Sequence, residues 1–152
     1  MNIFDQLRSG VATASAAETQ ALAAALARAL PPDTTLALHG DLGAGKTTFV
    51  QGLARGFGIP RPVTSPTFTI FNLHRGPVLP GPASARLTLL HLDAYRLENP
   101  AQLDALMLDE FLVPPYCLAI EWPENIAGWL PASALHLQLG IQKDERHAIR
   151  LR

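Results

Sequence analysis

The feature that most constrains this chain is the segment GDLGAGKT, residues 40–47, which follows the apolar run TTLALH and precedes TFVQGLARGFG. It fits the pattern G-x-x-x-x-G-K-[ST], with Gly40, Gly45, Lys46 and Thr47 at the fixed positions. Successive backbone N–H groups must point inward around a phosphate, and side chains at the glycines would block its approach. A strand before the segment and a helix after it therefore predict a phosphate-binding loop, or P-loop.

The loop also predicts how a nucleotide is held. The backbone N–H groups of the loop are expected to surround the phosphates. The helix that begins at the loop adds the positive end of its dipole. We expect Lys46 to reach the β- and γ-phosphates and the Thr47 hydroxyl to coordinate Mg²⁺. The Asn-Lys-x-Asp motif of guanine-binding proteins is absent, so ATP is favoured over GTP.

Apolar periodicity predicts alternating helices and strands around this loop. A helix is expected from Ser15, which forms a capping box with Glu18, and a second one opens near Lys46. The expected strands are residues 35–39, 67–73, 87–92, 117–120, 135–139 and 148–151. Residues 75–86, RGPVLPGPASAR, are expected to form an exposed Pro/Gly-rich loop. This order predicts one α/β domain over residues 1–152, with a mainly parallel central sheet.

Composition excludes several classes of protein. The 152 residues are 48% hydrophobic and 16% charged, as in folded globular domains. A formal net charge of −1 gives no basic excess for gripping nucleic acid directly. No apolar run approaches the roughly 20 residues of a membrane span, and MNIFDQLRSG is unlike a signal peptide. The single cysteine, Cys117, cannot form an internal disulfide, so we expect it to be buried in a cytoplasmic protein.

A P-loop enzyme also needs a carboxylate at the end of a neighbouring strand, to hold the Mg²⁺ shell or to orient water. Two candidates exist: LTLLHLD ends at Asp93 and CLAIE ends at Glu121. These patterns alone leave open which carboxylate has which role. His91 alternates with Asp93 and is expected to share its face of the sheet. The segment TSPT, residues 64–67, fits either a γ-phosphate-sensing switch or an ordinary turn.

Together, GDLGAGKTTF, SPTF, HLDAYRL and AIEWPE resemble, in this order, the bacterial TsaE family (the YjeE ATPases) over about residues 15–130. This family works in making threonylcarbamoyladenosine in tRNA. The resemblance implies a three-layer α/β/α ATPase with a mixed sheet. It also implies that the protein binds the TsaD–TsaB pair and hydrolyses ATP to reset that complex between turnovers. TsaD modifies the adenosine beside the anticodon, so contact with tRNA would be indirect.

The resemblance also implies roles for single residues around Mg²⁺ and ATP. The residues that would hold the phosphates are Gly40, Asp41, Leu42, Gly43, Ala44, Gly45, Lys46, Thr47 and Thr48. Thr47 and Glu121 would bind Mg²⁺, and Asp93 would take the other acidic position, with a role in hydrolysis. Trp122 would lie near the nucleotide. The family's Asp-Leu-Tyr-Arg is here DAYR, residues 93–96, and the alanine is expected to face away from Asp93.

Two further segments follow from the resemblance. The adenine is expected near the start of the first predicted helix, around Ser15 to Thr19. Residues 64–68, which include Thr64 and Ser65, would form the switch-like segment.

Two other functions remain open at this stage. A small-molecule or nucleoside kinase would need an acceptor pocket and a lid with several arginines. Arg75 and Arg86 flank a loop that could imitate such a lid, but no arginine cluster is evident. A nucleotide-dependent scaffold would bind ATP with negligible turnover.

Overall fold

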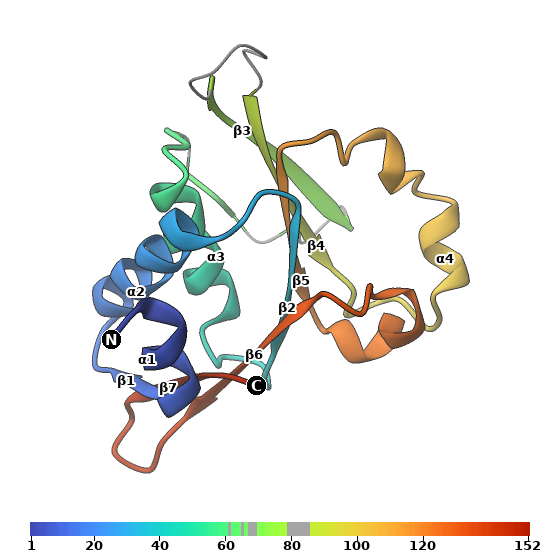
Figure 1. The fold of residues 1–152 in the computed structure, drawn as a ribbon. Helices are drawn as coiled ribbons and strands as arrows, with labels where there is room; N and C mark the ends of the chain where they lie inside the picture. The colour runs from blue at the N-terminus through green and yellow to red at the C-terminus, as the bar shows by residue number, and fades with distance from the viewer. Residues whose placement is uncertain (61, 65, 67–69, 79–85) are drawn as a thin grey trace.

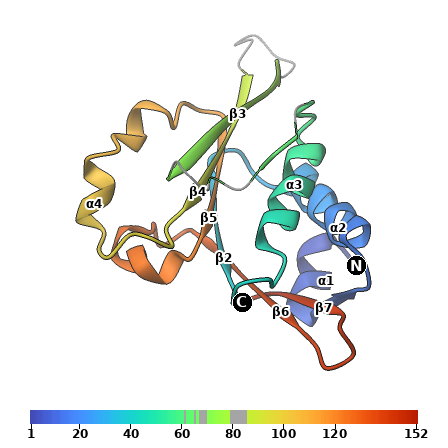
Figure 2. The same ribbon diagram turned by 180° about the vertical axis from the view of Figure 1, so that it is seen from behind.

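The computed structural model describes residues 1–60, 62–64, 66, 70–78 and 86–152. Its elements, in chain order, are α1 (Ile3–Ser9), β1 (Val11–Thr13), α2 (Ala16–Ala29), β2 (Thr34–His39), α3 (Lys46–Gly56), β3 (Phe71–Val78), β4 (Arg86–Asp93), α4 (Ala101–Asp104), η1 (Leu108–Glu110), β5 (Tyr116–Glu121), η2 (Pro123–Trp129), β6 (Leu135–Ile141) and β7 (His147–Leu151). Helices α1, α2 and α3 cover one face of the sheet, and α4, η1 and η2 lie on the other (Figures 1 and 2). The expected α/β architecture with helices on both faces is confirmed.

The seven strands form one mixed sheet in the order β1-β7-β6-β2-β5-β4-β3. Strands β6, β2, β5 and β4 run parallel to their neighbours in this group. The outer pairings, β1 with β7, β7 with β6 and β4 with β3, are antiparallel. The parallel part of the sheet is therefore its centre. The edges consist of the hairpins β3–β4 and β6–β7 and the short strand β1, and strands joined as hairpins pair antiparallel.

The edge strand β3 differs most from the sequence expectation. It runs to Val78, so the residues from Arg75 to Val78 belong to a strand rather than to the predicted Pro/Gly-rich loop. Arg75 pairs with Thr88 and Val78 with Arg86, with a register shift between the two pairs. An edge strand tolerates Pro77, because its missing N–H is not needed on the open side. Residues 67–69 of the predicted strand and 79–85 of the predicted loop lie outside the described residues.

Helices α2 and α3 pack side by side and run in the same direction. A Cβ atom on Gly52 would meet the backbone of Gln20, and one on Gly56 would meet the backbone of Ala24. Because both positions advance by four residues together, the N-termini of the two helices lie at the same end of the molecule. Helix α2 begins after the predicted N-cap Ser15, whose Oγ accepts a hydrogen bond from the Glu18 N–H.

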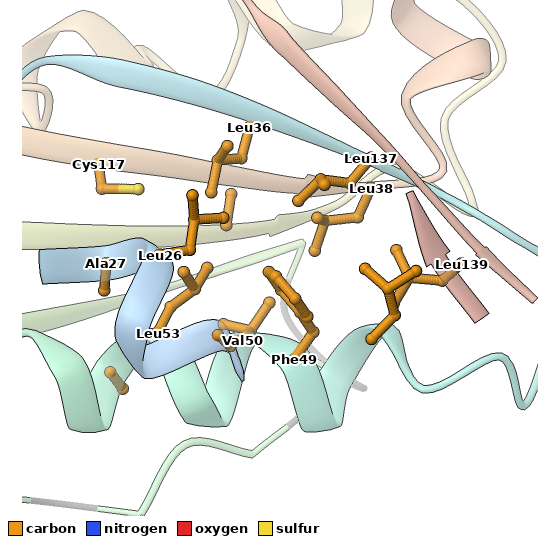
Figure 3. Close-up of a cluster of buried hydrophobic side chains, with 14 of the residues drawn as sticks. Leu26, Ala27, Leu36, Leu38, Phe49, Val50, Leu53, Cys117, Leu137 and Leu139 are labelled. Atoms are coloured by element: carbon orange, nitrogen blue, oxygen red, sulfur yellow. The ribbon is translucent and has the colours of Figure 1, made fainter. Parts of the chain in front are cut away.

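The core that holds this arrangement lies between α2, α3 and the parallel strands. Figure 3 shows Leu26 of α2 and Phe49 of α3 facing Leu36 and Leu137 of the sheet. The predicted burial of Cys117 is confirmed, and burial raises the pKa of its thiol to about 12. Across the described ranges, no helix combines the length and apolarity needed to cross a membrane.

Candidate functional site

The P-loop joins the end of β2 to the start of α3, and its glycines are required by its geometry. Gly40 has φ +151°, and a Cβ atom there would lie 2.5 Å from the Leu139 carbonyl oxygen. Gly45 has φ +98° and is the N-cap of α3. No side chain within the described part of the chain caps this helix, so its first N–H groups have no side-chain acceptor. The loop therefore presents backbone donors and a helix N-terminus to a ligand.

A pocket of about 370 Å³ opens at this loop, where the parallel strands end. Asp93 and Glu121 are the last residues of β4 and β5, and they are paired in the sheet register. Carboxyl ends of parallel strands are where α/β sheets bind ligands. The described residues that line the pocket are Leu42, Gly43, Gly45, Lys46, Thr47, Thr48, Asp93, Tyr95, Glu121, Trp122 and His147.

Lys46 is held inside the pocket, with only 5% of the residue exposed. Its Nζ donates a hydrogen bond to the Gly40 carbonyl oxygen at 2.6 Å and lies 3.6 Å from the centroid of the Trp122 ring. Burial lowers the pKa of Lys46 from its ordinary value, and the Glu121 carboxylate is the largest of several groups that oppose this shift. An anion that enters the pocket would meet this cation where the loop passes into α3.

Glu121 links the P-loop to the neighbouring strand. The Thr47 hydroxyl donates to Glu121 Oε2 at 3.2 Å and lies 3.5 Å from Oε1. Two oxygen ligands at adjacent positions of an octahedral Mg²⁺ site lie roughly 3 Å apart, given metal–oxygen distances of about 2.1 Å. A hydroxyl and a carboxylate at this spacing therefore fit Mg²⁺, which keeps water and phosphate oxygens as its other ligands.

No group of three or more His, Cys, Asp or Glu residues that could hold a metal ion by itself occurs among the residues that the structure describes.

Asp93 lies beside Glu121 and is half-buried. Its Oδ1 accepts a hydrogen bond from the Tyr95 N–H at 3.0 Å. Burial raises the pKa of Asp93 above its ordinary value, with a further contribution from the Glu121 carboxylate, while the Tyr95 N–H lowers it. The carboxylate therefore lies at the pocket wall, with no contact to the P-loop hydroxyl among the hydrogen bonds of the described residues.

Trp122 forms another part of the pocket wall. It has φ +57°, a backbone conformation that is uncommon for a bulky residue, and it precedes Pro123 at the start of η2. Its ring contacts the Tyr95 ring, with 5.1 Å between the two centroids, in addition to Lys46. The turn after β5 thus places an aromatic face directly over the P-loop cation.

Some predicted site residues do not line this pocket. Ser15 and Thr19 lie at the N-terminus of α2, where Thr19 is buried and its hydroxyl shares a hydrogen bond with Thr13 at 2.6 Å. The contacts of α2 with α3 lie further along both helices, with Gln20 against Gly52 and Ala24 against Gly56. Thr64 lines a different pocket, of about 830 Å³, near the end of α3 and β3, and its carbonyl accepts from Asn72. Ser65 lies outside the described residues.

Sequence reasoning assigned no role to two residues of the pocket wall, Tyr95 and His147. Tyr95 follows Asp93 closely, and its place in the motif DAYR was a usable signal. His147 comes from β7, and its Nδ1 lies 3.0 Å from the Ala44 carbonyl oxygen. No local pattern marks His147, because only the pairing of β7 with β6 and β1 brings it to the P-loop.

Comparison with known proteins agrees with this geometry. The family model for the threonylcarbamoyl adenosine biosynthesis protein TsaE matches residues 13–149. The tRNA threonylcarbamoyladenosine biosynthesis protein TsaE of Bacillus subtilis is 39% identical over 137 residues, covering 90% of this chain and 80% of the relative. The corresponding protein of Treponema pallidum is 35% identical over 135 residues, covering 89% of this chain and 93% of the relative.

A solved structure is similar as well. The crystal structure of Bacillus subtilis YdiB superposes with a TM-score of 0.72 at 34% identity, covering 93% of this chain and 82% of that one. The family match and the shared fold agree with the motif order read from the sequence. The chain therefore belongs to the TsaE family, which takes part in the biosynthesis of threonylcarbamoyladenosine in tRNA.

Proposed function

We propose that this protein is a Mg²⁺-dependent ATPase that supports threonylcarbamoyladenosine modification of tRNA by acting on the TsaD–TsaB complex. The observation that carries the proposal is the hydrogen bond between Thr47 and Glu121, which joins the P-loop to the strand-end carboxylate. The same pocket contains the buried cation of Lys46. A phosphate loop, a cation and a hydroxyl–carboxylate pair are the groups that binding of MgATP requires.

Each group has a separate role in this proposal. The backbone N–H groups of residues 40–48 bind the phosphates, and Lys46 exchanges its bond to the Gly40 carbonyl for phosphate oxygens. Thr47 and Glu121 would hold Mg²⁺. Bound Mg²⁺ neutralises charge on the β- and γ-phosphate oxygens. Asp93 is an acceptor close to the metal ligands without contacting Thr47, which suits a carboxylate that orients the attacking water.

The adenine and the switch segment are assigned less directly. The start of α2, with Ser15 and Thr19, is the proposed adenine region, because α2 packs parallel to the P-loop helix and the N-termini of both helices lie at the same end. Thr64 lines a different pocket, near the end of α3 and β3. Thr64 does not line the P-loop pocket, so it must approach the P-loop to sense the γ-phosphate. Trp122 covers Lys46 and would rearrange or stack when phosphates enter.

The composition of the pocket supports dependence on a partner. No arginine is among the described residues that line it, and Arg96 is exposed outside it. Fast hydrolysis in P-loop enzymes commonly needs an arginine, which contributes about 10³–10⁵ to the rate when supplied in cis or by a partner. We therefore propose that TsaD–TsaB completes the site. A net charge of −1 suits a protein that meets tRNA only through that complex.

Product analysis with γ-labelled ATP tests the proposal. The protein is incubated with MgATP, with and without TsaD, TsaB and tRNA, and the label is followed. Free phosphate supports an ATPase, whereas transfer of label to a small acceptor would show a kinase and unchanged ATP would show a scaffold. Lys46→Ala is the matched control, since it should retain the fold and lose the phosphate-binding cation.

A further inference from the structure

Besides the Thr47 hydroxyl, a buried histidine side chain on β4 contacts Glu121. The Nε2 atom of His91 lies 2.5 Å from Glu121 Oε2. His91 is 0% exposed on the central part of β4, and it pairs with Ala119 of β5, two residues before Glu121. Because both strands are internal strands of the sheet, the imidazole is a fixed anchor for the carboxylate.

Hydrogen-bond counting fixes which nitrogen of His91 carries the proton. A carboxylate oxygen only accepts, so Nε2 must donate to Glu121. The buried Nδ1 atom has no hydrogen-bond partner within the described residues. A proton on Nδ1 would therefore be an unpaired buried donor, which is strongly disfavoured. The arrangement specifies the tautomer with hydrogen on Nε2.

The two Glu121 oxygens differ in the donors that contact them. Oε2 accepts from His91 and is the nearer oxygen to the Thr47 hydroxyl, at 3.2 Å. Oε1 is 3.5 Å from the Thr47 hydroxyl and accepts from no other donor among the described residues. A glutamate side chain has three torsions, and a hydrogen bond from a rigid donor restricts them, so the carboxylate keeps one orientation.

We infer that His91 is a positioning residue that donates from Nε2 to Glu121 Oε2 and so presents Oε1, which lies 3.5 Å from the Thr47 hydroxyl, to a divalent cation. This inference rests on the proposed function, because it takes Glu121 as a metal ligand. It adds a residue to which the resemblance assigned no role. His91 itself touches neither phosphate nor metal.

The first test determines the tautomer of His91 in the protein without nucleotide or metal. A long-range ¹H–¹⁵N correlation spectrum of uniformly labelled protein distinguishes the two imidazole tautomers. His91 should give the pattern of hydrogen on Nε2, and this proton should exchange slowly because the residue is buried. A spectrum with hydrogen on Nδ1 would overturn the inference without any measurement of activity.

The second test measures the Mg²⁺ concentration that gives half-maximal enhancement of ATP binding, by calorimetry at fixed ATP. In His91→Leu this concentration should rise about 10–100-fold, as is typical when a partner of a metal ligand is removed. Binding of ATP without metal should change less than about twofold. In His91→Gln, whose amide nitrogen can donate from nearly the same place, most of the wild-type Mg²⁺ dependence should return.

His74→Leu is the matched control. His74 lies on the adjacent strand β3, pairs with Leu89, and has a buried Nε2 without a partner in the described residues. Its removal should leave the Mg²⁺ dependence unchanged. Equal losses of metal-free and Mg²⁺-dependent binding in His91→Leu, or no rescue by glutamine, would show a merely structural role.

The outcomes separate the inference from the proposed function. If wild-type protein binds ATP without any Mg²⁺ dependence, the proposed metal site itself is wrong. If the wild type depends on Mg²⁺ and His91→Leu retains that dependence, only the inference about His91 fails. If His91→Leu does not fold, the wild-type spectrum and the glutamine variant decide.

Discussion

Replacing Gly52 by alanine should destabilise the protein, although alanine is the better helix former. Gly52 is buried within α3, and a Cβ atom there would lie 2.5 Å from the Gln20 carbonyl oxygen, 2.6 Å from Gln20 Cα and 2.7 Å from Ala23 Cβ. Ordinary contacts begin near 3.4 Å, so the helices must separate by about 0.9 Å, the difference between 3.4 and 2.5 Å. Two of the three obstructing atoms are backbone and cannot rotate away.

The magnitude follows from two opposing terms. Exchanging glycine for alanine inside a helix contributes about 1 kcal/mol in favour of folding. Overpacking a close contact costs about 1–3 kcal/mol, and a contact against backbone belongs at the upper end of that range. The expected net loss is about 2 kcal/mol in the free energy of unfolding, or roughly 4–8 °C in Tm for a domain of this size.

Equilibrium urea unfolding followed by circular dichroism measures this loss. Gly128→Ala is the matched control, since the nearest atom to a Cβ there is Pro100 Cγ at 3.9 Å, and its stability should stay within about 0.5 kcal/mol of wild type. Gly52→Ala should also weaken ATP binding, because separating α2 from α3 moves the proposed adenine region away from the P-loop. A variant as stable as wild type, or more so, would refute the packing argument.

Three further predictions concern the pocket. Lys46→Ala should lower ATP affinity at least about 100-fold by calorimetry, because the loop loses its only cation near the phosphates; unchanged binding and hydrolysis would contradict the P-loop assignment. Glu121→Gln should need more Mg²⁺ to bind ATP, whereas Asp93→Asn should still bind MgATP and lose hydrolysis; the reverse pattern in a Mg²⁺ titration would exchange the two roles. Burial raises the pKa of Asp93, so its ionised form destabilises the fold above that raised pKa, and the penalty disappears as the pH falls below the unfolded value of 3.8. Asp93→Asn should therefore raise Tm at pH 7 and have less effect at pH 3, and thermal melts showing an equal effect at both pH values would contradict this linkage.

Most residues that line the pocket belong to short segments that can be recognised in the sequence alone. The P-loop is contiguous, and Asp93 and Glu121 each follow a short buried strand that the apolar pattern marks clearly. Parallel pairing of those strands then places both acids beside the loop. The placement of Trp122 follows in the same way, since it is the residue directly after β5.

The missed features depend on long-range pairing or on short elements. His147 reaches the P-loop only through the pairing of β7, and β1 (Val11–Thr13) is too short to show periodicity. The end of β3 was predicted as loop because Gly76 and Pro77 are turn residues, yet an edge strand accommodates them. Thr64, expected from the resemblance in a switch-like segment, lines a different pocket of the described structure, and its nucleotide contact stays a prediction.

Steady-state phosphate release tests the central claim most directly. The rate is measured with MgATP for the pure protein, and again after adding TsaD and TsaB, with Lys46→Ala protein as the background. We predict slow release by the protein alone and a rise of at least about tenfold with the pair, because the pocket lacks a lining arginine among the described residues. Rapid release by the pure protein that TsaD and TsaB leave unchanged would contradict partner-dependent hydrolysis and favour a self-contained enzyme.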